Sequence, residues 1–242
     1  MATYINQPTL AADFLAPLRT SCDVTGSALD GGRNGNGEGI SIEMSGGGML
    51  TATYEECMIK DPEHYEYVNM LGSRLNGGFR FINVPIITDW FGPFPKVNNL
   101  AAPYIRGIRH PDGSLFSDGA GYSQASVYGE ITENAALNAG IVKMQVFGLS
   151  RPLRWSDWFS IYHPFKGWRA YRYWDVLDAS GGENPIYTLA IAPPLREVVA
   201  AGTRVEFARP RFVAKFPTNF TLPSVVEAFF VTKQTMQFVE AF

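Results

Sequence analysis

Alternating apolar and polar positions recur along much of the chain and predict short β-strands. Gly, Pro or Asn separate the alternating runs, and these residues form turns and end strands. The runs are Phe159 and Ile161, Tyr171 and Tyr173, Leu189 and Ile191, Val205 and Phe207, Phe212 to Phe216, and Met236 and Phe238. Closely spaced short strands are typical of a sandwich or barrel. We therefore expect a mainly β fold, an antiparallel β-sandwich or split barrel.

One segment, about 61–76, has the period of an α-helix instead. Asp61 can cap the helix, and Pro62 fits the first helical position, where its missing N–H costs nothing. Gly77 follows as a stop signal. The apolar stripe recurs at spacings of three and four and consists of Val68, Leu71 and Leu75. The pattern predicts one helix that packs this stripe on a core.

Two neighbouring segments complete the first part of the chain. Residues 79–84 are rich in aromatic and β-branched side chains and predict a strand closed by Pro85. Residues 31–48 are rich in glycine around the short run 40–42, which predicts either a hairpin or a flexible loop.

A long segment, 89–140, is rich in Pro, Gly, Asn and Ser. Structureless loops of this length are uncommon and usually functional. We therefore expect a β-rich core with one helix, formed by 1–88 and 141–242, and a loop-rich inserted excursion over 89–140.

Composition narrows the function classes. Hydrophobic residues make up 46% and charged residues 18% of the 242 residues, which excludes a solvated disordered chain. The net charge of −3 argues against a dedicated nucleic-acid binder. The longest uncharged stretch, 1–12, is too short and too polar for a membrane span, and no signal peptide is visible. We expect no membrane association and synthesis in a cytoplasm.

The residue types that carry catalysis or bind cofactors do not form a convincing constellation. The glycine run 35–39 is followed by a strand-like segment, whereas a phosphate-binding loop is followed by a helix. Ser123 lacks the preceding strand and the following helix that a nucleophile elbow requires. The cysteines lack zinc-ligand spacing, and the histidines are scattered. These residues are Cys22, Cys57, His64, His110 and His163. We expect no enzyme, no cofactor and no metal site.

The strongest compositional anomaly is a cluster of aromatic and basic residues at 155–174. Its principal members are Trp155, Trp158, Trp168, Arg169, Tyr171, Arg172 and Trp174. Such a cluster forms a sheet face of stacked rings, anchors a protein interface, or binds glycan or nucleic acid. We treat these residues as a candidate subunit or partner interface, and the other two interpretations stay open.

Short motifs in chain order resemble the tail-tip proteins of long-tailed bacteriophages and gene transfer agents, in particular the distal tail (Dit-like) proteins. A glycine-rich strand precedes the helix that feeds Phe79, and aromatic strands follow the excursion. The motifs lie at 46–54, 71–81, 116–119, 158–162, 169–171, 191–197, 201–207, 210–212 and 238–242, so that the resemblance spans about 46–242.

This resemblance implies a non-enzymatic virion protein that is made in the host cytoplasm and assembles into a ring, expected to be a hexamer. The ring would join the tail tube protein to the baseplate hub protein and line the DNA channel at the tail tip. The long segment 89–140 departs from compact members of the family and would either be an extra decoration of the ring or contact side fibres. DNA would pass its lumen without specific binding.

Charge adds one expectation about that lumen. Residues 1–100 hold 6 basic and 11 acidic side chains, so acidic groups from this part are candidates to line a channel that DNA must not stick to. The candidates are Glu38, Glu43, Glu55 and Glu56. The alternative function is a glycan-binding β-domain that docks host surface polysaccharide through 155–174.

Overall fold

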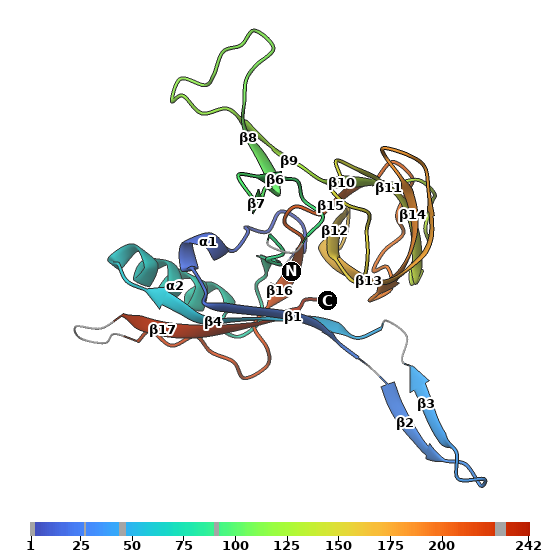
Figure 1. The fold of residues 1–242 in the computed structure, drawn as a ribbon. Helices are drawn as coiled ribbons and strands as arrows, with labels where there is room; N and C mark the ends of the chain where they lie inside the picture. The colour runs from blue at the N-terminus through green and yellow to red at the C-terminus, as the bar shows by residue number, and fades with distance from the viewer. Residues whose placement is uncertain (1–2, 27, 44–46, 90–91, 226–230) are drawn as a thin grey trace. The chain divides into compact units, whose positions relative to one another are not determined.

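The chain divides into two compact units in a computed structural model that describes residues 3–26, 28–43, 47–89, 92–225 and 231–242 (Figure 1). Unit 1 comprises 1–86, 163–169 and 211–242, and unit 2 comprises 87–162 and 170–210. The structure is built from antiparallel sheets, which confirms the predicted mainly β class.

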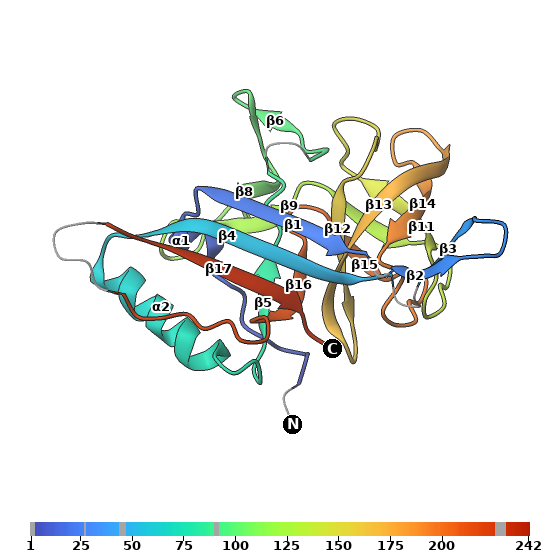
Figure 2. The ribbon, with the colours of Figure 1, turned by 90° about the horizontal axis from the view of Figure 1, so that it is seen from below.

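Unit 1 is organised around a five-stranded sheet (Figure 2). Its strands, in spatial order, are β1 (Arg19–Thr25), β4 (Met49–Ile59), β17 (Thr232–Glu240), β16 (Arg211–Lys215) and β5 (Ile82–Pro85). The alternation predicted for β17 is confirmed, because Met236 and Phe238 are buried while Thr235 and Gln237 are exposed. All of its ladders are antiparallel, and β1 and β5 form its edges.

The predicted helix is confirmed as α2 (Pro62–Leu75), which follows the short helix α1 (Ala12–Leu15). The predicted stripe of Val68, Leu71 and Leu75 is buried. Asp61 occupies the N-cap position, but its side chain makes no capping bond and lies 3.5 Å from the His64 ring instead.

The strand predicted over 79–84 begins later than expected. Strand β5 covers Ile82–Pro85, and Phe79 is 81% exposed. The difference follows from strand pairing, because only Ile82 to Pro85 lie opposite β16, and Pro85 is the last residue paired rather than a stop beyond the strand.

The connection between β1 and β4 is a two-stranded hairpin. It consists of β2 (Ala28–Arg33) and β3 (Gly39–Glu43), so the hairpin alternative for the glycine-rich segment is confirmed over 31–43, while 44–46 lie outside the described residues. Its turn is fixed by Asn34, whose side-chain oxygen accepts from the backbone N–H groups of Asn36 and Glu38 at 3.0 and 2.9 Å. Gly37 has a φ of 82°, which favours glycine.

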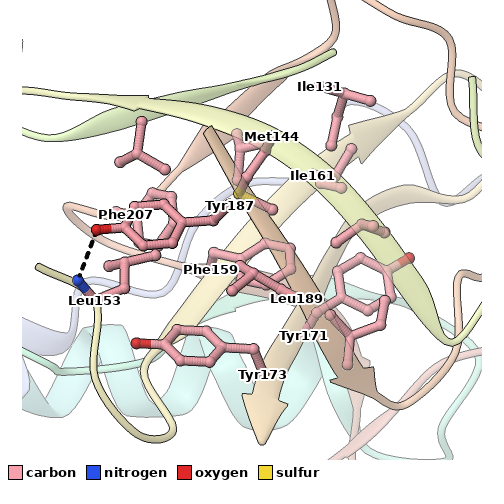
Figure 3. Close-up of a cluster of buried hydrophobic side chains, with 14 of the residues drawn as sticks. Ile131, Met144, Leu153, Phe159, Ile161, Tyr171, Tyr173, Tyr187, Leu189 and Phe207 are labelled. Atoms are coloured by element: carbon pink, nitrogen blue, oxygen red, sulfur yellow. Dashed lines mark hydrogen bonds between the residues drawn. The ribbon is translucent and has the colours of Figure 1, made fainter. Parts of the chain in front are cut away.

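Unit 2 contains a closed barrel of six strands. In spatial order these are β10 (Tyr128–Ile131), β11 (Ile141–Phe147), β14 (Ile186–Ala192), β13 (Gly167–Ser180), β12 (Trp158–His163) and β15 (Arg204–Glu206). The apolar positions of the alternating runs predicted between 159 and 207 fill its interior together with Met144 and Tyr187 (Figure 3). Closure leaves no free edge within the barrel.

The predicted excursion 89–140 lies wholly within unit 2, as does much of 141–210, which we had expected in the same core as 1–88. Two small hairpins lie within the excursion: β6 (Lys96–Val97) with β7 (Leu100–Ala101), and β8 (Tyr104–Ile108) with β9 (Tyr122–Ala125). It ends in the barrel, because β10 pairs with both β11 and β15.

Candidate functional site

The aromatic and basic cluster at 155–174 is divided by the fold. Trp158 is buried on β12, Tyr171 belongs to the buried cluster inside the barrel, and the guanidinium carbon of Arg172 lies 5.1 Å from the centroid of the Trp158 ring. Tyr171 is not exposed at its hydroxyl end either, because this hydroxyl accepts a hydrogen bond from the backbone N–H of Arg196 at 3.1 Å. These side chains stabilise the barrel, which corresponds to the sheet-packing interpretation.

The middle of the cluster, 163–169, belongs to unit 1. The guanidinium carbon of Arg211 lies 4.3 Å from the centroid of the Trp168 ring. Arg169 is fully buried and donates to Glu240 Oε1 at 3.1 Å and to the Ala241 carbonyl at 2.6 Å. Arg169 is therefore part of the interior of unit 1 and is not accessible to a partner.

Two tryptophans of the cluster remain at the surface. Trp155 is 84% exposed and Trp174 is 62% exposed. Trp155 lines an open hollow of about 480 Å³ on unit 2, whose other lining residues are Leu153, Arg154, Asp175 and Val176. Trp174 is not one of its lining residues.

The loop that carries Trp155 is held on both sides by buried hydrogen bonds. The backbone N–H of Leu153 donates to the Tyr187 hydroxyl at 3.2 Å (Figure 3). The Tyr173 hydroxyl donates to Asp157 Oδ2 at 2.9 Å. Burial raises the pKa of Asp157, while the hydrogen bond from Tyr173 and the charge of Arg151, 3.5 Å away, counteract this effect. The exposed ring therefore projects from a fixed backbone.

The acidic side chains proposed for a lumen are largely paired. Glu55 lies 4.0 Å from Arg19, and Glu56 forms an ion pair with Lys233 that lowers the pKa of Glu56. Glu38 accepts a hydrogen bond from the Asn34 side chain at 2.9 Å. The side chain of Glu43 lies outside the described residues. Because Lys233 lies outside residues 1–100, its ion pair with Glu56 makes the negative field of this region weaker than the charge count of 1–100 predicts.

The β2–β3 hairpin presents an apolar face that the sequence analysis did not identify as a site. Leu29 and Ile42 are direct cross-strand partners, and Ile40 lies two residues from Ile42 on the same face. Leu29 and Ile42 are each 55% exposed and Ile40 is 44% exposed. The alternation Ile40-Ser41-Ile42 predicts one apolar face for this strand. Whether that face is exposed depends on β2 and β3 pairing only with each other, which the alternation does not predict.

The residues considered for catalysis lie apart from one another. His64 stacks on Phe14 with ring centroids 4.2 Å apart, His110 packs in the β8–β9 hairpin, and His163 is buried in unit 1. Ser123 lies on β9, and the next element is the strand β10, where a nucleophile elbow needs a helix. In the part of the chain that the structure describes, no three His, Cys, Asp or Glu side chains form a group able to hold a metal ion.

Neither helix of the described residues is long and apolar enough to cross a membrane.

Comparison with protein-family models and with curated proteins finds no match to this chain. The resemblance to distal tail proteins stays a prediction.

Proposed function

We propose that this chain is a non-enzymatic structural subunit of the phage tail tip, a distal tail protein that assembles with copies of itself into a ring. The observation that carries the proposal is the uncovered apolar face of the β2–β3 hairpin. Fully burying a Leu or Ile side chain stabilises by about 1.5–3 kcal/mol, so covering these three half-exposed side chains contributes roughly 3 kcal/mol per hairpin.

A second copy of the chain is the partner that best fits this hairpin. The hairpin connects β1 to β4, and β1 is an edge strand whose outer N–H and C=O groups face no other strand of the sheet. An edge strand invites pairing with another chain. The hairpin and the edge strand are two different surfaces of one subunit, and repeated head-to-tail contact between two such surfaces forms a ring when the rotation between neighbouring subunits closes, and an open filament when it does not.

The tail-tip location is supported by the motifs that resemble distal tail proteins and by the mainly antiparallel β fold that the resemblance implies. In this proposal the ring joins the tail tube protein to the baseplate hub protein in the virion, and unit 2 is the part available to side fibres. DNA passes through the lumen without specific binding. Glu38, Glu55 and Glu56 contribute to its lining, and the cationic partners of Glu55 and Glu56 limit the net charge.

Light scattering with negative-stain imaging of the purified protein tests assembly directly. We expect a sixfold ring with an open lumen. The variant Leu29→Ser/Ile42→Ser should shift the protein toward monomer without lowering its thermal stability. The matched control is Met70→Ser, which removes a 44% exposed side chain from α2 and should leave assembly unchanged.

A wild-type protein that stays monomeric at high concentration, alone and with the tube and hub proteins, would overturn the ring. A ring that forms equally well in the hairpin double variant would overturn the role of the hairpin.

Glycan binding is a second proposal, and the hollow beside Trp155 is the observation that favours it.

A further inference from the structure

The hollow on unit 2 combines an aromatic platform with two unpaired polar side chains. Trp155 is the platform, and Arg154 and Asp175 line the same hollow. Among the described residues, none of these three side chains has a hydrogen bond or an ion pair. Leu153 and Val176 supply the apolar remainder of the lining. A concavity lined by apolar and aromatic side chains with a few polar groups is typical of a small-ligand site.

The platform is held in place before any ligand arrives. The hydrogen bonds from Leu153 to Tyr187 and from Tyr173 to Asp157 fix the loop two residues before and two residues after Trp155. A ligand that stacks on this ring therefore orders little additional backbone, which lowers the entropic cost of binding. An indole that serves only packing would be covered, whereas Trp155 is among the most exposed aromatic side chains of the chain.

The polar groups restrict the ligand class. Arg154 offers N–H donors and Asp175 offers acceptor oxygens, and their formal charges cancel. A ligand with a strong charge of either sign meets one attractive and one repulsive group. A neutral pyranose matches the set, because its C–H face stacks on an aromatic ring while its hydroxyls both accept and donate hydrogen bonds. A single-stranded nucleic acid fits less well, because its phosphates require a positively charged groove.

We propose that this hollow binds a pyranose unit of a neutral surface polysaccharide, with Trp155 as the stacking platform and with Arg154 and Asp175 hydrogen-bonded to ring hydroxyls. The proposal narrows the glycan alternative from the whole segment 155–174 to one side of the barrel. It does not depend on ring formation, because all five lining residues belong to unit 2 of one chain.

The test is an array of neutral, phosphorylated and sulfated bacterial surface polysaccharides together with cellohexaose, maltohexaose and chitohexaose, followed by calorimetric titration of the strongest binder. We expect Trp155→Ala to weaken binding by about tenfold or more, equivalent to about 1.4 kcal/mol. Asp175→Asn and Arg154→Met should each weaken it severalfold. Trp174→Ala is the matched control, since it removes an exposed tryptophan from the same barrel and should leave the affinity unchanged.

Three results would overturn the proposal. The first is no binding to any member of the panel at millimolar concentration. The second is equal loss of affinity in Trp155→Ala and Trp174→Ala, which would place the contact elsewhere. The third is binding only to phosphorylated or sulfated saccharides that Asp175→Asn strengthens, which would replace the neutral ligand by an anionic one. Light scattering of Trp155→Ala should match the wild type, so loss of assembly and loss of glycan binding are separable.

Discussion

Arg169 is the side chain whose replacement most directly tests how unit 1 is held together. Its guanidinium is fully buried and donates to Glu240 Oε1 at 3.1 Å, to the Ala241 carbonyl at 2.6 Å and, through Nε, to the Lys166 carbonyl at 3.0 Å. Through these bonds the turn between β12 and β13 is joined to the end of β17. The variant Arg169→Met keeps an apolar stem of similar reach and removes every one of them.

The expected loss of stability follows from the groups left behind. Removing one partner of a buried ion pair typically costs about 3–5 kcal/mol, because the other charge stays buried without compensation. Glu240 keeps the hydrogen bond from the backbone N–H of Leu50 at 3.3 Å, so we expect a cost at the lower end of this range, about 3 kcal/mol for the pair. The rings of Tyr4 and Phe242, each with its centroid 5.4 Å from the guanidinium carbon, add a cation–π loss of about 0.5–2 kcal/mol.

Urea unfolding gives the free-energy change, and hydrogen exchange with mass spectrometry assigns it to a unit. Exchange should accelerate in β16 and β17 of unit 1 and much less in β11 and β14 of the barrel. Arg172→Met is the control, because this residue of the same strand contacts Trp158 at a partly exposed site and its loss should cost about 1 kcal/mol or less. The double variant Arg169→Met/Glu240→Leu should be more stable than Arg169→Met. A cost below about 1 kcal/mol for Arg169→Met, or a double variant less stable than the single one, would refute the reasoning.

Three further predictions concern buried groups and one tight turn. Burial and, to a lesser degree, a neighbouring guanidinium lower the pKa of His163 from 6.5 to about 4. As the pH falls, the unfolded chain therefore binds a proton before the folded chain does, and the stability of unit 1 should fall by up to about 3 kcal/mol between pH 6.5 and 4. The pH profile of His163→Gln should be flatter. Gly148→Ala should destabilise the barrel by about 1–3 kcal/mol in thermal unfolding, because φ is 75° and a Cβ would lie 2.0 Å from a backbone carbonyl oxygen, whereas Gly140→Ala meets nothing within 4 Å and should be nearly neutral. Tyr173→Phe should cost about 1–3 kcal/mol at pH 7 by removing the hydrogen bond to the buried Asp157. Because this bond lowers the pKa of Asp157, the cost of Tyr173→Phe should shrink toward acidic pH, and an equal cost at pH 4.5 and 7 would contradict this account.

The local features of the fold were predictable from the sequence because they depend on neighbouring residues. The stripe of Val68, Leu71 and Leu75 and the glycines after it define α2, whose observed bounds differ from the prediction by one residue at each end. The alternation at Phe159 and Ile161 correctly identifies side chains that point into the barrel. In these cases the period of the pattern is the period of the structure.

The features that depend on pairing partners were not predictable in this way. Phe79 has strand-forming character, yet the strand starts at Ile82 because only from there does β16 lie opposite. The division into units likewise depends on β10 closing a barrel with β15, more than 70 residues away. Long-range pairing of this kind leaves no periodic trace in either segment alone.

The candidate sites show the same limit at the scale of single residues. Trp155 and Trp158 are three residues apart, yet the first is almost fully exposed and the second is buried. Their difference arises from the loop anchored by Asp157 and from the point where the chain enters β12. On β13, a register shift between Tyr173 and Asp175 interrupts the simple alternation, and both Trp174 and Asp175 are exposed. Composition located the aromatic cluster, but tertiary structure decides which member a ligand can reach.

Ring assembly and glycan binding reinforce each other because a ring carries many copies of the glycan-binding hollow, although the two proposals share no residues. A single open hollow with one stacking ring and two hydrogen-bonding side chains binds weakly, because few groups are desolvated. A ring presents the same hollow once per subunit, and a polysaccharide repeats its sugar many times. Each contact after the first is then made at an effective concentration that reaches about millimolar for closely tethered sites, which raises avidity by about 10²–10⁴ without any new interaction. The hairpin variant Leu29→Ser/Ile42→Ser should therefore lose polysaccharide avidity while keeping the affinity of each hollow for a hexasaccharide, a combination that loss of the hollow itself does not produce.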